Sequence, residues 1–249
     1  MKRLMSAALA VMLTVALCSS AFAKDIIVAH DTNFKPFEFK QDGKYTGFDI
    51  ELWEAIAKEL KLEYKSQPMD FNGIIPGLQT GSVDVGIAGM TIKPSREKVV
   101  DFSSPYYDSG LVILVRADNT DIKSIDDLKG KVIATKLATS SADFAKENIP
   151  SARVSLFPSN ENMFMELVNG GADAVIFDLP VCQEYAMSPV GKGKVKVTGP
   201  LYSGQSYGIA FPKGSELRDK VNTALATLKA NGTYEELYVK WFGKLPAKK

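Results

Sequence analysis

Residues Leu78-Gln-Thr-Gly-Ser-Val-Asp84-Val-Gly-Ile-Ala88 and Leu167-Val-Asn-Gly-Gly-Ala-Asp173-Ala-Val-Ile-Phe177 repeat one pattern at a constant offset of 89. In each copy a glycine, Gly81 or Gly170, stands just past a helical pattern, where a residue in the left-handed conformation closes the helix. An apolar strand follows in both copies. The repeat predicts two lobes that share a helix-turn-strand unit, and the alternative is a chance similarity between two such units.

The rest of the chain alternates short apolar strands with amphipathic helices. In one of these helices Ile50, Trp53 and Ile56 recur at helical spacing, and Asp49 stands where it can cap the first turn. This alternation predicts an α/β fold rather than a β-sandwich or a helix bundle. The expected strands are residues 26–29, 83–88, 111–115, 132–135, 154–157, 174–177 and 207–211, and the expected helices are residues 50–60, 71–80, 141–148, 160–169, 180–187, 215–231 and 234–241.

Polar residues follow the strand in both copies of the repeat. The first strand leads into Gly89-Met90-Thr91, and the second leads into Asp178. In open α/β sheets, ligands bind beyond the carboxyl ends of the strands. We therefore expect these two strand ends to furnish a cleft between the lobes.

The composition is that of an ordinary globular protein. Of 249 residues, 45% are hydrophobic and 24% are charged, with 30 basic and 29 acidic side chains. The near-zero net charge gives no electrostatic footprint for nucleic acid, and the usual nucleic-acid-binding motifs are missing. The familiar catalytic motifs are missing too, and His30, the sole histidine, has no partner for a nucleophile pair or a transition-metal site. An enzyme that needs only Asp or Glu stays open.

The first 23 residues have the pattern of a secretory signal peptide. Lys2 and Arg3 precede an apolar run from Leu4 to Leu17, and the small-residue site Ala21-Phe22-Ala23 follows. The run is shorter than the roughly 20 residues that span a bilayer. Cleavage after Ala23 predicts a periplasmic protein in which Cys182 is the only thiol, so no intrachain disulfide is possible.

Several runs together resemble one family, the polar amino-acid family of periplasmic solute-binding proteins, over essentially all of the mature chain. The runs are Asp31-Thr-Asn-Phe34-Lys-Pro36-Phe37-Glu38-Phe39, Gly47-Phe48-Asp49-Ile-Glu51-Leu52, Ala88-Gly89-Met90-Thr91-Ile-Lys-Pro-Ser-Arg96-Glu, Phe102-Ser-Ser-Pro-Tyr106-Tyr107 and Gly232-Thr-Tyr234 with Trp241-Phe242-Gly243. Within the family, the chain most resembles the glutamine-binding member.

The resemblance implies a two-lobed periplasmic-binding-protein fold of type II. With the signal peptide over residues 1–23 set aside, it predicts a discontinuous large lobe of residues 24–106 and 207–249, a small lobe of residues 110–202, and hinges near 106–110 and 202–206. It also implies a monomer that closes around an L-amino acid, with glutamine favoured, and delivers it to an inner-membrane ABC permease. No catalysis, cofactor, metal or nucleic-acid partner is expected.

The resemblance also implies the ligand contacts, at Asp31, Phe34, Phe71, Gly89, Thr91, Arg96, Lys136, Ser140 and Asp178. Arg96 should bind the α-carboxylate, since a planar guanidinium matches a carboxylate bidentately, with backbone amides at Thr91 and Ser140 assisting. The α-ammonium should meet the Asp178 carboxylate, the Gly89 carbonyl and the Thr91 hydroxyl. Without the family motif, Arg96 reads as a solvated arginine and Asp178 as a helix cap.

The remaining contacts should recognise the ligand side chain. Phe34 and Phe71 should sandwich its aliphatic stem, although periodicity alone would place both in the core. Asp31 can accept from a side-chain amide while Lys136 donates to it, so the pair suits glutamine better than a charged side chain. The alternative is a simple salt bridge between Asp31 and Lys136.

Two departures from the glutamine-binding pattern concern ligand identity. Phe177 stands where that member carries a histidine, and Ser140 stands where a glycine is usual. A serine amide can still donate, provided that the local backbone suits a residue other than glycine. The alternative functions are a receptor for another polar amino acid, a periplasmic dehydratase-type enzyme on the same fold, and the sensing component of a signalling system.

Overall fold

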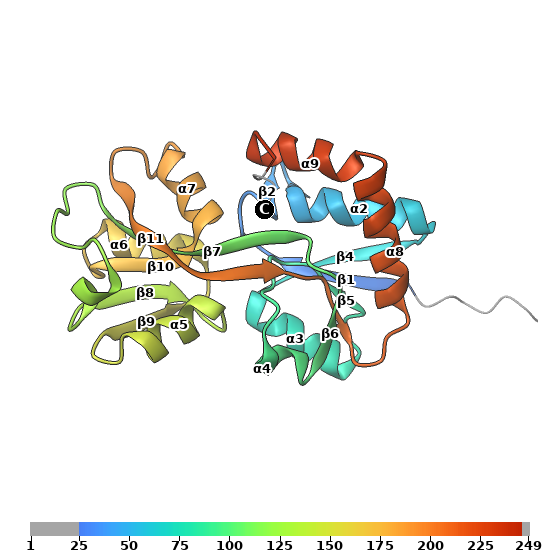
Figure 1. Cartoon of the computed structure of the whole chain (residues 1–249), viewed down its shortest axis with the longest axis horizontal. Coiled ribbons are helices and arrows are strands. Elements are labelled where there is room, and N and C mark those ends of the chain that lie inside the picture. The colour runs from blue at the N-terminus through green and yellow to red at the C-terminus, as the bar shows by residue number, and fades with distance from the viewer. Residues whose placement is uncertain (1–24, 246–249) are drawn as a thin grey trace, which may run out of the picture.

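The structure is a computed structural model that describes residues 25–245, and the predicted signal peptide lies outside them. Two lobes lie side by side, each built on its own five-stranded sheet with helices packed against it (Figure 1). This confirms the two-lobed α/β fold expected from the sequence. No helix within residues 25–245 is both long and apolar enough to cross a bilayer.

The first lobe contains a mixed sheet in the order β4-β1-β5-β12-β6. Its strands are β1 (Ile26–Asp31), β4 (Tyr64–Met69), β5 (Val85–Gly86), β6 (Val100–Phe102) and β12 (Ala210–Pro212), beside a hairpin of β2 (Phe39–Gln41) and β3 (Lys44–Thr46). Its helices are α2 (Phe48–Leu60), α3 (Phe71–Thr80), α4 (Pro94–Glu97), α8 (Leu217–Ala230) and α9 (Thr233–Phe242). Figure 1 shows α2 and α9 above this sheet and α3 and α4 below it.

The second lobe contains a sheet in the order β11-β7-β10-β8-β9. Its strands are β7 (Tyr107–Arg116), β8 (Val132–Lys136), β9 (Arg153–Phe157), β10 (Ala174–Asp178) and β11 (Val195–Tyr207). Its helices are α5 (Ser140–Asn148), α6 (Asn160–Val168) and α7 (Leu179–Met187), with a 3-10 turn over Ile125–Leu128. The antiparallel strands β7 and β11 also run together toward the first lobe, where Tyr107 pairs with Tyr207 (Figure 1).

The sequence repeat corresponds to one structural device used in both lobes. Asp84 follows α3 and accepts a hydrogen bond of 2.9 Å from the backbone amide of Ile27 in β1. Asp173 follows α6 and accepts one of 2.8 Å from the amide of Val132 in β8. The strand after each aspartate then runs parallel to the strand that the aspartate holds, because β5 pairs with β1 and β10 pairs with β8. The repeat therefore fixes the centre of each sheet.

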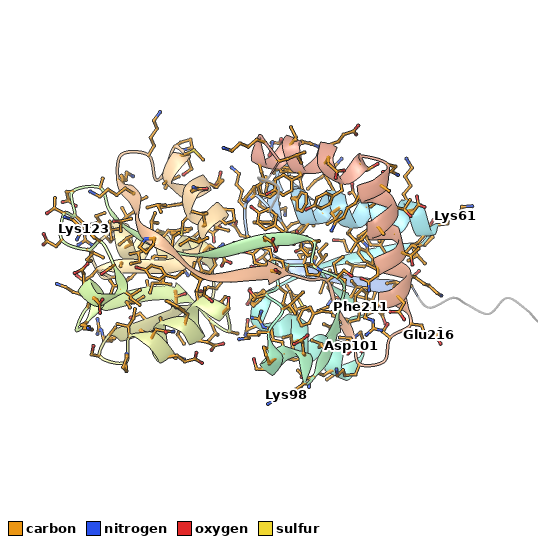
Figure 2. All side chains as sticks on the ribbon, viewed as in Figure 1. Lys61, Lys98, Asp101, Lys123, Phe211 and Glu216 are labelled. Atoms are coloured by element: carbon orange, nitrogen blue, oxygen red, sulfur yellow. The ribbon has the colours of Figure 1, made fainter. Side chains whose placement is uncertain are left out.

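Aromatic side chains fill the junction where β7 and β11 enter the first lobe. The Tyr107 ring stacks between Tyr207 and Tyr238, with ring centroids 5.6 Å apart on each side. Phe37 and Phe48 are fully buried beside them. Charged side chains lie at the surface instead, and Figure 2 shows the exposed side chains of Lys61, Lys98 and Lys123 pointing outward.

Two local expectations were wrong. Asp49 does not cap its helix, because α2 begins at Phe48, two residues before the expected start, and its cap Gly47 makes no side-chain bond. The Asp49 carboxylate instead lies in the core and accepts a hydrogen bond of 2.8 Å from the amide of Gly89. The single strand expected at residues 207–211 is divided, since β11 ends at Tyr207 and β12 begins at Ala210.

Candidate functional site

A small cavity of about 20 Å³ lies between the two lobes. All nine residues that the sequence indicated as ligand contacts line it, together with Ala88, Thr139 and Phe177. Both lobes contribute, as expected for residues that end parallel strands: Asp31 ends β1, Lys136 ends β8 and Asp178 ends β10. The topology thus brings charged side chains from distant parts of the chain to one place.

Arg96 lies on α4 at one wall of the cavity and is only 5% exposed. One guanidinium nitrogen, Nη1, donates to the Thr91 carbonyl at 3.0 Å, and Nη2 donates to the Ala138 carbonyl of the second lobe at 3.0 Å. The guanidinium carbon also lies 5.3 Å from the centre of the Phe71 ring. Burial lowers the pKa of Arg96 to about 10, so the group stays cationic at neutral pH. A guanidinium has five N–H donors, so it can bind an anion as well.

Asp178 ends β10 in the second lobe and is 5% exposed. It occupies the position before the first residue of α7, yet its side chain makes no capping hydrogen bond. Its Oδ1 atom instead accepts a hydrogen bond from the hydroxyl of Tyr207. Burial raises the pKa of the Asp178 carboxyl to about 6, and the bond from Tyr207 opposes that rise. The carboxylate is therefore available to a cation at neutral pH.

Asp31 and Lys136 form an ion pair across the cavity, and their side chains are only 2% and 3% exposed. The Asp31 Oδ1 atom also accepts a hydrogen bond of 2.8 Å from the backbone amide of Thr32. Burial raises the pKa of Asp31, and the charge of Lys136 opposes the rise. The salt bridge considered from the sequence is thus present, and a ligand side chain reaching this end would meet both charges.

Aromatic rings bound the cavity on the side of the first lobe. Phe34 contacts Phe177 of the second lobe edge to face, with centroids 5.8 Å apart. Phe34 also packs directly on Gly89, whose φ is +51°. A Cβ atom at position 89 would lie 2.3 Å from Phe34 Cε1, so glycine is required here.

Gly89 is held from behind by two residues that the sequence did not indicate as part of the site. Its amide donates to Asp49 Oδ2 at 2.8 Å and to the Tyr106 hydroxyl at 3.1 Å. The Tyr106 hydroxyl in turn donates to Asp49 Oδ2 at 2.7 Å. Burial raises the pKa of Asp49 to about 6, while the bonds from Tyr106 and Gly89 oppose the rise. Because the sequence indicated Asp49 as a helix cap, it did not predict that Asp49 holds Gly89 in place.

The turn from Lys136 to Ser140 accommodates serine without backbone strain at that position. Thr139 caps α5 by accepting from the amide of Ala142, and Ser140 is the first helical residue. The positive φ of the turn, 62°, falls on Ala138 instead. The Ser140 hydroxyl lies 3.2 Å from the Thr91 hydroxyl of the first lobe, so this helix start meets the opposite wall of the cavity.

Further polar contacts hold the lobes together outside the cavity. They are an ion pair between Lys93 and Asp143, a salt bridge of 2.6 Å between Lys35 and Glu184, and a hydrogen bond of 2.8 Å from the Asn160 amide to the Asn33 carbonyl. Together with the bond from Arg96 to Ala138, these contacts describe lobes that are closed on each other.

The arrangement suits the binding of a small zwitterion. A guanidinium from the first lobe and a carboxylate from the second line the same cavity, and the rings of Phe34, Phe71 and Phe177 line it as well. Within residues 25–245, no group of three or more His, Cys, Asp or Glu side chains is placed to hold a metal ion.

Comparisons with known proteins identify the family to which this chain is similar. Residues 26–244 match the family described as "Bacterial extracellular solute-binding proteins, family 3". The ABC transporter arginine-binding protein 1 of Escherichia coli (strain K12) is 34% identical over 246 residues, covering 97% of this chain and 99% of that protein.

Solved structures of binding proteins are also similar. An ancestral arginine-binding protein, solved with glutamine and with arginine, has a TM-score of 0.84 and 44% identity, covering 88% of this chain and 98% of that one. The ancestral amino acid-binding protein AncCDT-1, a precursor of cyclohexadienyl dehydratase, has a TM-score of 0.79 and 43% identity, covering 88% and 95%.

Proposed function

Because the chain belongs to the bacterial extracellular solute-binding proteins of family 3, we propose that it captures one L-amino acid between its lobes and delivers it to an ABC importer. One observation carries this proposal: Arg96 and Asp178, from opposite lobes, line one buried cavity. An amino acid carries the two complementary charges. Its α-carboxylate would pair with Arg96 and the amides of Thr91 and Ser140, and its α-ammonium with Asp178, the Gly89 carbonyl and the Thr91 hydroxyl.

Glutamine is the ligand that we favour. At the far end of the cavity Asp31 supplies an acceptor and Lys136 supplies a donor, and a side-chain amide needs both. Glutamate would bring its charge against Asp31, and arginine would bring its charge against Lys136. An uncompensated charge in a closed cavity costs several kcal/mol, which is about 10²-fold in affinity. Phe34 and Phe71 would pack on the methylene groups.

The biological setting is part of the same proposal. The protein would work in the periplasm as a monomer, after removal of residues 1–23, and would pass its ligand to an inner-membrane permease. The large lobe would comprise residues 24–106 and 207–249, the small lobe residues 110–202, and the hinges residues 106–110 and 202–206. Ligand would stabilise the closed form because it contacts both lobes.

Thermal-shift screening of ligand-stripped protein against the twenty amino acids tests the proposal. A ligand that binds only the native state at 100 times its Kd adds about 2.7 kcal/mol of stability, so the melting temperature should rise clearly with glutamine. A screen in which no amino acid raises the melting temperature would refute amino-acid capture. A rise with arginine but not with glutamine would keep the receptor and overturn the choice of ligand.

A dehydratase-type enzyme is the second candidate, favoured by the likeness to AncCDT-1 and by the raised pKa of Asp178. We propose binding without catalysis, because the charges that line the cavity are accounted for by an amino acid and its side chain. Incubation with candidate amino acids, followed by NMR, separates the two functions. A receptor returns its ligand unchanged, whereas product formation would favour the enzyme.

A further inference from the structure

Tyr207 connects the two lobes at the back of the cavity. It is fully buried and is the last residue of β11. Its backbone pairs with Thr91, and its carbonyl accepts a hydrogen bond of 2.9 Å from the amide of Tyr106, so the main chain here is fixed to the first lobe. Its hydroxyl, however, donates to Oδ1 of Asp178 in the second lobe.

We propose that Tyr207 is a positioning residue that holds the Asp178 carboxylate ionised and oriented for the ligand ammonium. The inference rests on the proposed function, because it assigns the ammonium to Asp178. A phenol has one donor and a carboxylate has two oxygens, so the bond to Oδ1 fixes the carboxylate and leaves Oδ2 for a second donor. Tyr207 itself is not among the residues that line the cavity, so it acts through Asp178.

The surroundings of Asp178 explain why this one hydroxyl matters. The titratable groups that face its carboxyl are Arg96 from α4, Lys136 from β8, Tyr107 from β7, Cys182 from α7 and Tyr207 from β11. After burial, which raises the pKa of Asp178, the hydrogen bond from Tyr207 has the largest effect, and it favours the charged form. Burial also keeps the pKa of the Tyr207 phenol well above its ordinary value, so Tyr207 remains a donor at neutral pH.

Loss of the hydroxyl should therefore change both the affinity and its dependence on pH. Tyr207→Phe keeps the ring and its stacking but removes the donor, so the carboxyl of Asp178 should protonate at higher pH. Loss of a hydrogen bond to a charged group shifts the pKa of that group by about one unit. We expect Tyr207→Phe to lose affinity from a pH about one unit higher than wild type, so that it binds about twofold more weakly at pH 7 and about tenfold more weakly at pH 5.

The experiment is calorimetric titration between pH 5 and pH 9, with glutamine or with the amino acid that stabilises the wild type most. Tyr234→Phe is the matched control, because it removes a hydroxyl from the same aromatic junction that donates to the Tyr106 carbonyl and not to Asp178. This control should keep the wild-type pH midpoint. In the Asp178→Asn background, Tyr207→Phe should change affinity at pH 5 less than about twofold, because the two residues act as one unit.

A second replacement protects the test against misfolding. Site-specific 3-fluorotyrosine at position 207 keeps the packing but makes the phenol a stronger donor, so the pH midpoint should move downward. A wild-type affinity and midpoint in Tyr207→Phe, or an equal loss with and without Asp178, would overturn the inference. If Tyr207→Phe does not fold, an unmoved midpoint in the fluorinated protein overturns it.

The proposed function and this inference fail in different ways. If the wild type binds none of the twenty amino acids, the proposed function fails and the role of Tyr207 fails with it. If the wild type binds an amino acid and loses it on Arg96→Ala while the pH midpoint of Tyr207→Phe stays in place, the inference alone is wrong.

Discussion

Lys136→Met should convert the proposed preference of the cavity for glutamine into a preference for arginine. Methionine has about the length of lysine without its charge, so the change removes one member of the buried ion pair and leaves Asp31 alone. Removal of one partner from a buried pair costs about 3–5 kcal/mol. A ligand that carries its own cation to Asp31 recovers that energy, whereas the neutral amide of glutamine recovers only a hydrogen bond.

The expected change follows from these two values. A hydrogen bond to a charged group contributes about 1.5–3 kcal/mol, so arginine should gain roughly 2 kcal/mol over glutamine, or about 30-fold in relative affinity. Because arginine also escapes the repulsion by Lys136, the total reversal should reach about 10²-fold or more. Glutamate should bind the variant more weakly than it binds the wild type, since its carboxylate would face Asp31 without a neighbouring cation.

Competition calorimetry with glutamine, arginine and glutamate measures this reversal. Lys35→Met is the matched control, because Lys35 forms a salt bridge with Glu184 but is 45% exposed, and exposed pairs contribute about 0–1 kcal/mol. It should leave the order of ligands unchanged. A Lys136→Met variant that still binds glutamine at least tenfold more tightly than arginine would refute the electrostatic reasoning.

Three further predictions concern the opposite end of the cavity and its backbone. Arg96→Ala removes the proposed partner of the α-carboxylate and two hydrogen bonds to backbone carbonyls, so calorimetry should show a loss of about 10²-fold or more. A variant within tenfold of wild type contradicts the assignment. The affinity of the wild type should fall about tenfold from pH 7 to pH 5, because protonation of Asp178, with its pKa of about 6, removes the charge that pairs with the ammonium. Asp178→Asn should abolish this pH dependence, and an unaltered dependence would assign it to another group. Gly89→Ala should lower the melting temperature by roughly 4–8 °C, because the added Cβ would collide with Phe34. Gly214 has a similar positive φ but open space around it, so Gly214→Ala should lower the melting temperature less. Equal shifts in the two variants would argue against the clash.

The sequence was informative where a local signal and a tertiary role coincide. The apolar spacing of α2 and the glycine that ends α3 are local, and both elements lie where they were expected. The strand ends at Gly89 and Asp178 were indicated by the rule for α/β sheets and do line one cavity. Periodicity was silent for β4, a polar edge strand that contains Pro68, and for β11, which Gly199 and Pro200 interrupt.

Residues that act through distant partners could not be found in the same way. Asp49 lies 40 positions from Gly89, and at a helix start an aspartate is read as a cap whatever it contacts in space. Tyr207 lies 29 positions from Asp178, and an aromatic residue at the end of an apolar strand reads as core. Both residues are buried, and only the three-dimensional structure shows which polar atom each one contacts.

The cavity is lined by residues of both lobes. Arg96 and Gly89 belong to the first lobe, whereas Lys136 and Asp178 belong to the second. A ligand therefore makes all of its contacts only when the two lobes have closed. The apparent affinity is then the intrinsic affinity of the closed form multiplied by the fraction of molecules that are closed. While the open form predominates, a substitution far from the ligand that shifts this equilibrium by about 1.4 kcal/mol changes the apparent affinity tenfold. Substitutions between the lobes can thus change the affinity, while substitutions of the residues that line the cavity change the choice of ligand.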